Sequence, residues 1–167
     1  MDHQKALIEE YERETASTRK TLEAIPEDAD FAWKPHAKSF SLGRLAGHTS
    51  ELAGNWGIST LTTDGIIVPA GHKFEPYIVA SKAEMLERFD RETATVKTEL
   101  ASFAPERWDE TWKFQVGDAT YVSGPKGEIF RTWVLNHMIH HRAQLGVYLR
   151  LLDQPIPGIY GPSADSR

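Results

Sequence analysis

Two histidines near the C-terminal end of the chain have the spacing of a metal site. The segment HMIHHRAQ carries His137 and His141 four residues apart. On an α-helix, residues four positions apart lie one turn apart on the same side, so their imidazoles can bind one metal ion together. The chain contains no cysteine. A metal would therefore be bound without thiolate ligands, and any thiol chemistry would need a thiol from a second molecule.

Apolar residues surround both histidines on a helical wheel. With His137 at zero, roughly 100° per residue places His141 near +40°. His140 falls at about −60°, at the margin of the apolar stripe, and is the weaker candidate ligand. Gln144, at about −20°, is the other polar residue within the stripe. The apolar members of the stripe are Phe130, Trp133, Val134, Leu145, Tyr148, Leu151 and Leu152. Both imidazoles are therefore predicted to point into the core.

A third histidine, His48, lies in the middle of the apolar face of another predicted helix. Leu45, Leu52 and Trp56 form this face. Burying an imidazole is costly unless its nitrogens have partners. For a single core histidine, hydrogen bonds to a buried polar group are the simpler interpretation. Three inward-pointing histidines on two helices are better explained by a shared metal ion.

The predicted metal site consists of His48, His137 and His141. Three neutral nitrogen ligands leave at least one coordination position open, which is typical of catalytic rather than structural metal sites. Met138 stands where the HExxH metalloprotease motif requires glutamate, so that class of enzyme is excluded. All-imidazole ligation suits zinc or nickel best, and the sequence does not decide between these and iron, copper or cobalt.

Four segments with helical periodicity must position these residues. A serine N-cap at Ser41 opens the second segment, and a capping box of Ser81 and Glu84 opens the third. The predicted helices cover residues 2–25, residues 42–61, the segment between Ser81 and Pro105, and a segment that starts at 123–125 and ends near 153. The sequence therefore predicts an all-α fold, a four-helix bundle in a single domain that spans residues 1–167.

Two of the connections between these helices are unusual. Residues 62–80 form a 19-residue connection between the second and third helices. This length indicates either a functional crossing loop or a short strand. Residues 112–122 alternate in character around Gly117-Asp118, which predicts a small hairpin before the fourth helix.

The composition limits the classes of partner. Hydrophobic residues make up 40% of the 167 residues, enough to bury a core. The 19 basic residues are scattered among 24 acidic ones, and the net charge of −5 argues against a nucleic-acid partner. No uncharged apolar run approaches the ~18 residues that a membrane span needs, and the charged N-terminus lacks the apolar core of a secretory signal. We expect a cytoplasmic protein with no membrane partner.

Several segments, taken in order, resemble the DinB family of metal-dependent four-helix bundles. These segments are FAWKP, SFSLGRLAGHTSEL, HMIHHRAQL and PGIYGPSAD, and the resemblance covers residues 2–163. Its specificity lies in the ordered combination of His48, His137, His141 and Gln144. Ala143 departs from the pattern, because many relatives have glycine before the glutamine.

The resemblance implies a divalent metal held by His48, His137 and His141. Gln144, polar and one turn beyond His141, is predicted to orient a ligand imidazole and is the candidate cofactor-binding residue. Relatives form homodimers, so the resemblance also implies a homodimer. Characterised relatives include thiol S-transferases and mycothiol-dependent isomerases, so it implies a small-molecule substrate as well. A Lewis-acidic metal lowers the pKa of a bound thiol, so a low-molecular-weight thiol is the expected cosubstrate. Two functions stay open at this point, a metal-dependent thiol S-transferase and a non-catalytic metal or small-ligand binding module.

The remaining polar and aromatic residues are weaker candidates. Glu51 and Asn55 lie near His48 on the wheel, and either could orient its imidazole. Trp56 and Trp133 could form walls of the site. The other residues are predicted to lie on the surface, and they are Asn136, Arg142, Arg150, His3, His36 and His72.

Overall fold

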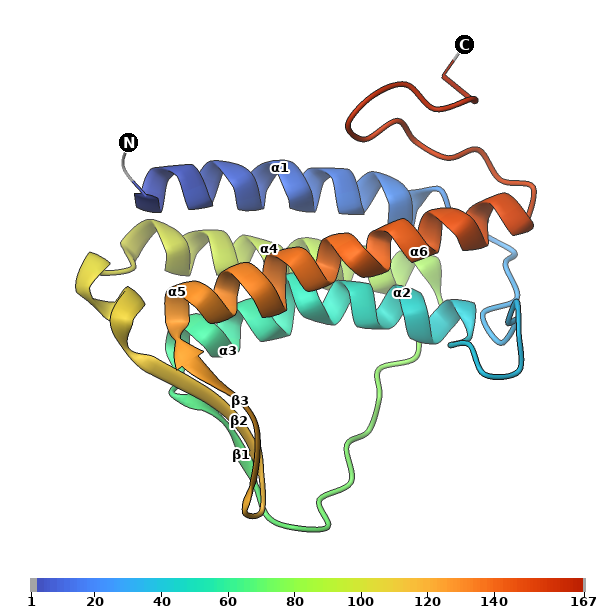
Figure 1. Cartoon of the computed structure of the whole chain (residues 1–167). Coiled ribbons are helices and arrows are strands. Elements are labelled where there is room, and N and C mark those ends of the chain that lie inside the picture. Colours follow the sequence, from blue (N-terminus) through green and yellow to red (C-terminus); the bar gives the residue numbers. More distant parts are fainter. Residues whose placement is uncertain (1–2, 167) are drawn as a thin grey trace.

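The structure is a computed structural model that describes residues 3–166. Four long helices pack side by side in these residues (Figure 1), as the helical periodicity predicts. Two of them are regular helices, α1 (His3–Glu23) and α4 (Lys82–Ser102). Two are composite. The first joins α2 (Leu42–Glu51), a π-helical segment (Leu52–Trp56) and α3 (Gly57–Thr62), and the second joins α5 (Lys126–Ile129), a π-helical segment (Phe130–Asn136) and α6 (His137–Leu151).

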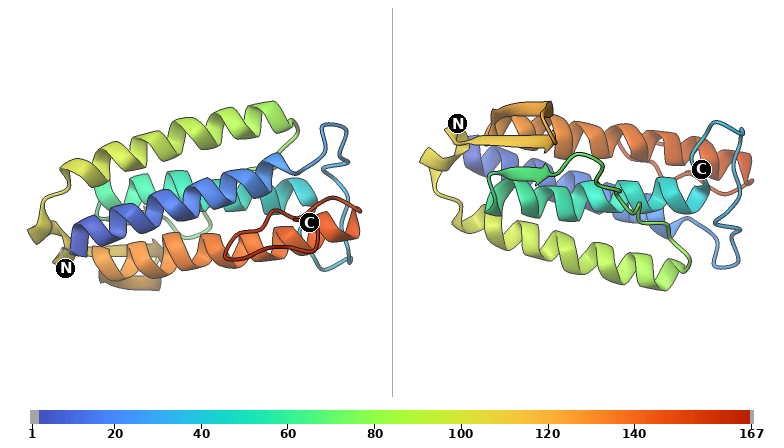
Figure 2. Two further views of the ribbon diagram at one scale, coloured as in Figure 1. Left: turned by 90° about the horizontal axis from the view of Figure 1, so that it is seen from above. Right: turned by 90° about the horizontal axis from the view of Figure 1, so that it is seen from below.

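The arrangement of the helices places α6 between two neighbours. Helix α6 packs against α2 on one side and against α1 on the other. Viewed from above, α1 lies between α4 and α6, and viewed from below, α2 and α3 take that place (Figure 2). Side chains on opposite sides of α6 therefore face different helices, and this decides the surroundings of its polar residues.

Local capping interactions start two of the helices where the sequence predicts them. The Ser41 hydroxyl accepts a hydrogen bond from the backbone N–H of Arg44 at 3.1 Å. The Ser81 hydroxyl accepts one from the N–H of Glu84 at 3.4 Å. Each serine satisfies an amide that would otherwise lack a partner in the first turn. A short 3₁₀ helix, Pro105–Asp109, follows α4.

A small sheet corrects the all-α prediction in part, because the four-helix bundle is present but is not purely helical. Strands β1 (Gly65–Val68), β2 (Thr111–Val116) and β3 (Ala119–Pro125) form it in that order, with β1 parallel and β3 antiparallel to β2. The predicted hairpin is β2–β3, and Gly117 in its turn has the positive φ of 56° that suits glycine. Strand β1 is the short strand considered for the long connection. It pairs with a segment more than forty residues away, so no local pattern specifies that pairing.

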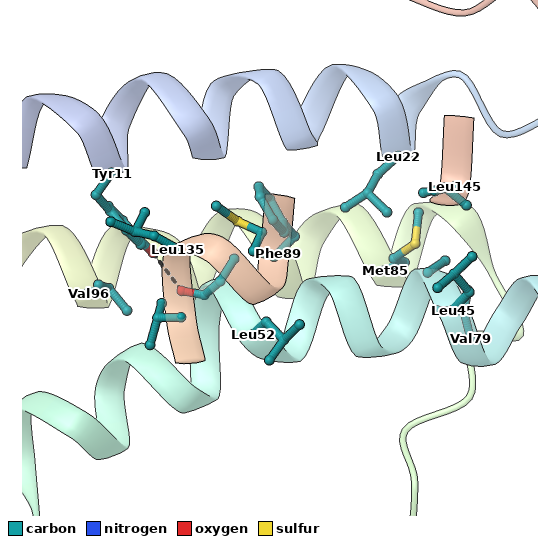
Figure 3. Close-up of a cluster of buried hydrophobic side chains, with 14 of the residues drawn as sticks. Tyr11, Leu22, Leu45, Leu52, Val79, Met85, Phe89, Val96, Leu135 and Leu145 are labelled. Carbon is teal, nitrogen blue, oxygen red and sulfur yellow. Dashed lines mark hydrogen bonds between the residues drawn. The ribbon is translucent and has the colours of Figure 1, made fainter. Parts of the chain in front are cut away.

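The core fills the space between the four helices. Figure 3 shows part of it, where Tyr11 of α1 and Phe89 of α4 lie among aliphatic side chains of the other helices. The Tyr11 hydroxyl is buried and donates a hydrogen bond to the carbonyl oxygen of Ala53 at 2.7 Å. Among the described residues, no helix combines the length and the apolar character needed to cross a membrane.

The two π-helical segments change the helical register beside the histidines. The segments contact each other, one beginning four residues after His48 and the other ending immediately before His137. A wheel of constant 100° per residue therefore fails across this region. Within the regular helix α6 the wheel holds, but its buried face is centred away from the predicted stripe: Leu151 is 56% exposed, whereas Met138 and Leu149 are fully buried. Insertions of this kind are frequent at functional sites.

Candidate metal centre

The three predicted histidines come together between α2 and α6. One nitrogen from each of His48, His137 and His141 lies within 4.8 Å of the nitrogens of the other two. The ring centroids of His48 and His137 are 5.2 Å apart, and each lies 4.7 Å from the His141 centroid. His141 is buried and the other two are partly buried. The sequence thus predicts the convergence correctly, while ligation of a metal stays a prediction.

The distances and the donor set fit a divalent cation. Nitrogen ligands lie about 2.0–2.1 Å from zinc, so two imidazole nitrogens on one ion are separated by at most about 4.2 Å. The Nε2 atoms of His137 and His141 are 2.9 Å apart, within that limit. The three nitrogens all lie within 4.8 Å of one another, which exceeds this limit by at most about 0.6 Å. Two neutral imidazoles in such contact can share only one proton, whereas a cation would satisfy the lone pairs of both.

Gln144 orients the imidazole of His141. Its Oε1 lies 2.8 Å from Nδ1 of His141, and its Nε2 lies 3.1 Å from Nε2 of His140. Since an amide oxygen only accepts, the Nδ1–H of His141 donates to it, and the Nε2 lone pair of His141 remains free toward His137. This contact gives Gln144 an orienting position beside the metal centre, and its cofactor-binding role stays a prediction.

An ion pair of Arg44 and Glu51 borders His48. Nη1 of Arg44 donates to Oε2 of Glu51 at 2.8 Å and to the carbonyl oxygen of Tyr77 at 3.1 Å. The Nδ1 atom of His48 lies 3.3 Å from Nη2 of Arg44 and 3.6 Å from Oε2 of Glu51. Burial alone would raise the pKa of Glu51, but hydrogen bonds with His48 and Arg44 outweigh it and lower the pKa. A guanidinium only donates, so Nη2 of Arg44 faces the Nδ1 lone pair of His48, and the ionised Glu51 accepts from Arg44.

The sequence analysis named Glu51 and Asn55 but missed Arg44. Asn55 is exposed and only lines a hollow next to Glu51. Arg44 lies four residues before His48 and seven before Glu51, a spacing that places all three on one side of a helix. That periodicity is the signal that could have found it.

Burial keeps two of the imidazoles neutral. Desolvation, followed by the neighbouring histidines, lowers the pKa of His137 to about 4. Desolvation also lowers the pKa of His141 to about 4, although the hydrogen bond with Gln144 acts in the opposite direction. At neutral pH both rings are therefore deprotonated at one nitrogen, as metal ligation requires.

Aromatic side chains border the histidines. Trp133 meets the His137 ring edge-on at 5.9 Å between centroids, and Trp56 stacks on Trp133 at 5.9 Å. Phe40 stacks on His141 at 6.4 Å and meets His48 edge-on at 6.1 Å. Phe40 lies in an irregular segment before α2, so no periodic pattern could have placed it at the site.

The other histidines lie outside the group of three. His140 contacts the ring of His141 at 4.9 Å between centroids, but its Nε2 bonds to Gln144. His36 and His72 are exposed, as predicted. The side chain of His3 lies outside the described part of the structure.

Arg142 is buried, which contradicts its predicted place on the surface. Its Nη2 donates to Oε2 of Glu14 at 2.8 Å and to the hydroxyl of Tyr160 at 2.6 Å. Its Nη1 donates to the carbonyl oxygen of Glu14 at 3.0 Å and lies 3.3 Å from the hydroxyl of Thr18. The prediction failed because it treated Arg142 alone, without the acidic partner on α1. Asn136 and Arg150 are exposed, as expected.

Comparison with known proteins places this geometry in a family. The family model described as the DinB family matches residues 1–166. An uncharacterized protein of Bacillus subtilis, YrdA, is 27% identical over 168 residues, which cover 99% of this chain and 90% of that protein.

Two solved structures share the fold. A DinB-like protein from Bacillus cereus matches with a TM-score of 0.69 and 20% identity over 93% of this chain and 97% of that one. The DinB-like protein YjoA from Bacillus subtilis matches with a TM-score of 0.68 and 16% identity over 95% of this chain and 99% of that one. The chain belongs to the DinB family.

Proposed function

We propose that His48, His137 and His141 bind one divalent cation, zinc or nickel, and that the protein is a metal-dependent enzyme of the thiol S-transferase kind. The observation that carries this proposal is the convergence of three imidazoles from two helices within 4.8 Å of one another. Three nitrogen ligands leave room for a further ligand, which a site for catalysis needs. The absence of cysteine from the chain makes an external thiol the source of sulfur.

Each residue of the site has a defined part in this proposal. Bound there, the cation would act as a Lewis acid that lowers the pKa of a thiol. Gln144 accepts the Nδ1 proton of His141, so this ring presents its Nε2 lone pair to the site, and Arg44, paired with Glu51, borders the Nδ1 edge of His48. Gln144 also lines a cavity beside His141, where a small-molecule cofactor would contact it.

The metal is tested by elemental analysis of the purified protein. We expect about one equivalent of zinc or nickel, lost in each of the variants His48→Ala, His137→Ala and His141→Ala. The exposed His72, replaced by alanine, is the matched control and should leave the metal content unchanged. Wild-type protein that takes up no divalent metal at all would refute the proposal.

The reaction is tested by turnover of the metal-loaded protein. We expect conjugation of an electrophile such as a haloarene with one member of a panel of low-molecular-weight thiols, and no conjugation by the His137→Ala variant. If no thiol supports turnover while one equivalent of metal is bound, the protein is a metal or small-ligand binding module and not a transferase.

We also propose that residues 1–167 act as a single domain and that two chains pair as a homodimer in the cytoplasm. Large apolar side chains on the surface support pairing, because Ile67 is 56%, Tyr121 65% and Leu151 56% exposed. Light scattering should give twice the chain mass, and a monomer mass would refute the dimer.

A further inference from the structure

A cavity of about 390 Å³ lies directly beside the metal centre. Its wall is formed by the segment that leads into α2, by α2 itself and by residues 141–148 of α6. The lining residues are Ser39, Phe40, Leu45, His141, Gln144, Val147 and Tyr148. His141 belongs both to this wall and to the group of three histidines, so a molecule in the cavity would lie in contact with the centre.

The wall of this cavity carries no charge. Its seven residues include no aspartate, glutamate, lysine or arginine. The hydroxyl of Tyr148 is occupied by the carbonyl oxygen of Phe40 at 3.0 Å. Away from the metal centre itself, a charged group would lose hydration against this wall without gaining a counter-charge.

The nearest cationic group that the contacts reveal is already neutralised. The guanidinium of Arg44 lies over the Phe40 ring, 5.4 Å from its centroid, but its Nη1 is bonded to Glu51. A second hollow, of about 370 Å³, reaches His137 and is lined also by Thr132, Trp133, Asn136 and His140, with no lysine or arginine. Neither opening offers a free basic side chain to a carboxylate or phosphate.

Phe40 gives the cavity a fixed apolar face. The hydroxyl of Tyr148 donates a hydrogen bond to the backbone carbonyl of Phe40, and the Phe40 ring packs against His48 and His141. The side chain is nevertheless 45% exposed, and Val147 opposite in the wall is 59% exposed. Exposed apolar surface beside a polar centre is typical of a small-molecule pocket, and the volume lies in the usual range of about 300–1,000 Å³.

We propose that this cavity binds the uncharged, largely apolar body of the substrate, an aryl or branched alkyl group without carboxylate, phosphate or ammonium. The polar group of the same molecule then reaches the three histidines. This inference rests on the proposed metal site, since that site anchors the polar group.

The test uses cobalt-loaded protein and two thiols of matched shape, benzyl mercaptan and its para-carboxylate. Cobalt bound by the histidines has its own visible spectrum, and thiol binding adds a charge-transfer band that can be titrated. We expect the neutral thiol to bind at least about tenfold more tightly than the carboxylate, because only the carboxylate must be desolvated without a partner.

Charged variants of exposed residues on α6 make the test specific. Val147→Lys places an ammonium in the wall and should reverse the preference, so that the carboxylate binds more tightly. Leu151→Lys is the matched control, because Leu151 is 56% exposed on the same helix but does not line the cavity. This control should keep the preference of the wild type.

The outcomes separate this inference from the proposed function. Equal affinities for the two thiols, or a preference unchanged by Val147→Lys, would overturn the uncharged subsite while the cobalt spectrum leaves the metal site standing. Protein that gives no cobalt spectrum before any thiol is added would overturn the metal site, and the subsite with it.

Discussion

His141 and Arg142 are consecutive residues of α6, both buried and both polar, yet their surroundings differ in kind. His141 faces α2 and meets the imidazoles of His48 and His137. Arg142 faces α1 and donates to Glu14 and Tyr160. The set of partners around Arg142 is closed within the chain. His137 and His141 face each other through two Nε2 atoms that share at most one proton, so a cation would satisfy the lone pairs of both.

The pKa values express the same difference. Burial would raise the pKa of Glu14, but hydrogen bonds with Tyr160 and Arg142 outweigh it and the pKa is lowered. Opposite charges therefore compensate each other on the α1 side. On the α2 side, desolvation and the neighbouring histidines disfavour protonation of His137. A polar cluster whose hydrogen-bonding groups are all paired within the chain therefore stabilises the fold, whereas a cluster with unpaired groups marks a site for a ligand.

The largest effect should come from opening the closed cluster. Arg142→Leu leaves the carboxylate of Glu14 buried without a counter-charge, which costs about 3–5 kcal/mol of unfolding free energy. Urea denaturation of the metal-free protein measures it. The exposed Arg150, which pairs with Asp165, is the control, and Arg150→Leu should cost less than about 1 kcal/mol. If Arg142→Leu loses no more unfolding free energy than Arg150→Leu, the cluster of Arg142 and Glu14 does not stabilise the fold as described.

Removing a histidine should instead affect metal binding. His137→Ala should lower zinc affinity by more than the roughly 10–100-fold that loss of an outer partner costs. The unfolding free energy of the metal-free variant should change far less than in Arg142→Leu. Competition with a chromophoric chelator gives the affinity, and His140→Ala is the neighbouring control that keeps the ligand set. Equal losses of zinc affinity in His137→Ala and His140→Ala would show that His137 is not a ligand.

A smaller effect is expected from Gln144. Gln144→Leu removes the acceptor for the Nδ1 proton of His141 and should weaken zinc binding by about 10–100-fold. Gln144→Glu retains an acceptor oxygen and should recover most of the affinity. If both variants bind zinc as the wild type does, Gln144 does not orient the ligand.

A pH dependence of the metal-free fold is also expected. The folded-state pKa of His137 and of His141 is about 4, below the ordinary value of 6.5, so the unfolded chain binds more protons between these limits. The stabilising preference for neutral rings is present above about pH 6.5 and is lost as the pH falls toward 4. We expect the unfolding free energy to fall across this window, as measured by urea denaturation. A doubly substituted His137→Asn/His141→Asn protein should show a flatter profile.

Local features of the sequence accounted for much of the fold. Serine caps at Ser41 and Ser81 and the periodic apolar residues gave the helices, and Gly117-Asp118 gave the hairpin. The sheet as a whole did not follow, because β1 reaches β2 through a connection that contains all of α4. Pairing across such a distance leaves no periodic signal in either segment.

For the candidate site, residue type and spacing determined which histidines could share an ion, because the i, i+4 relation fixes neighbours on any helix. Only the tertiary structure decided what surrounds them. The position of Phe40 depends on the packing of an irregular segment against α6, and the burial of Arg142 depends on Glu14, which is 128 residues away. The physical reason is that a helix dictates the angles between its own side chains, whereas the neighbour that each side chain meets is set by how the helices pack.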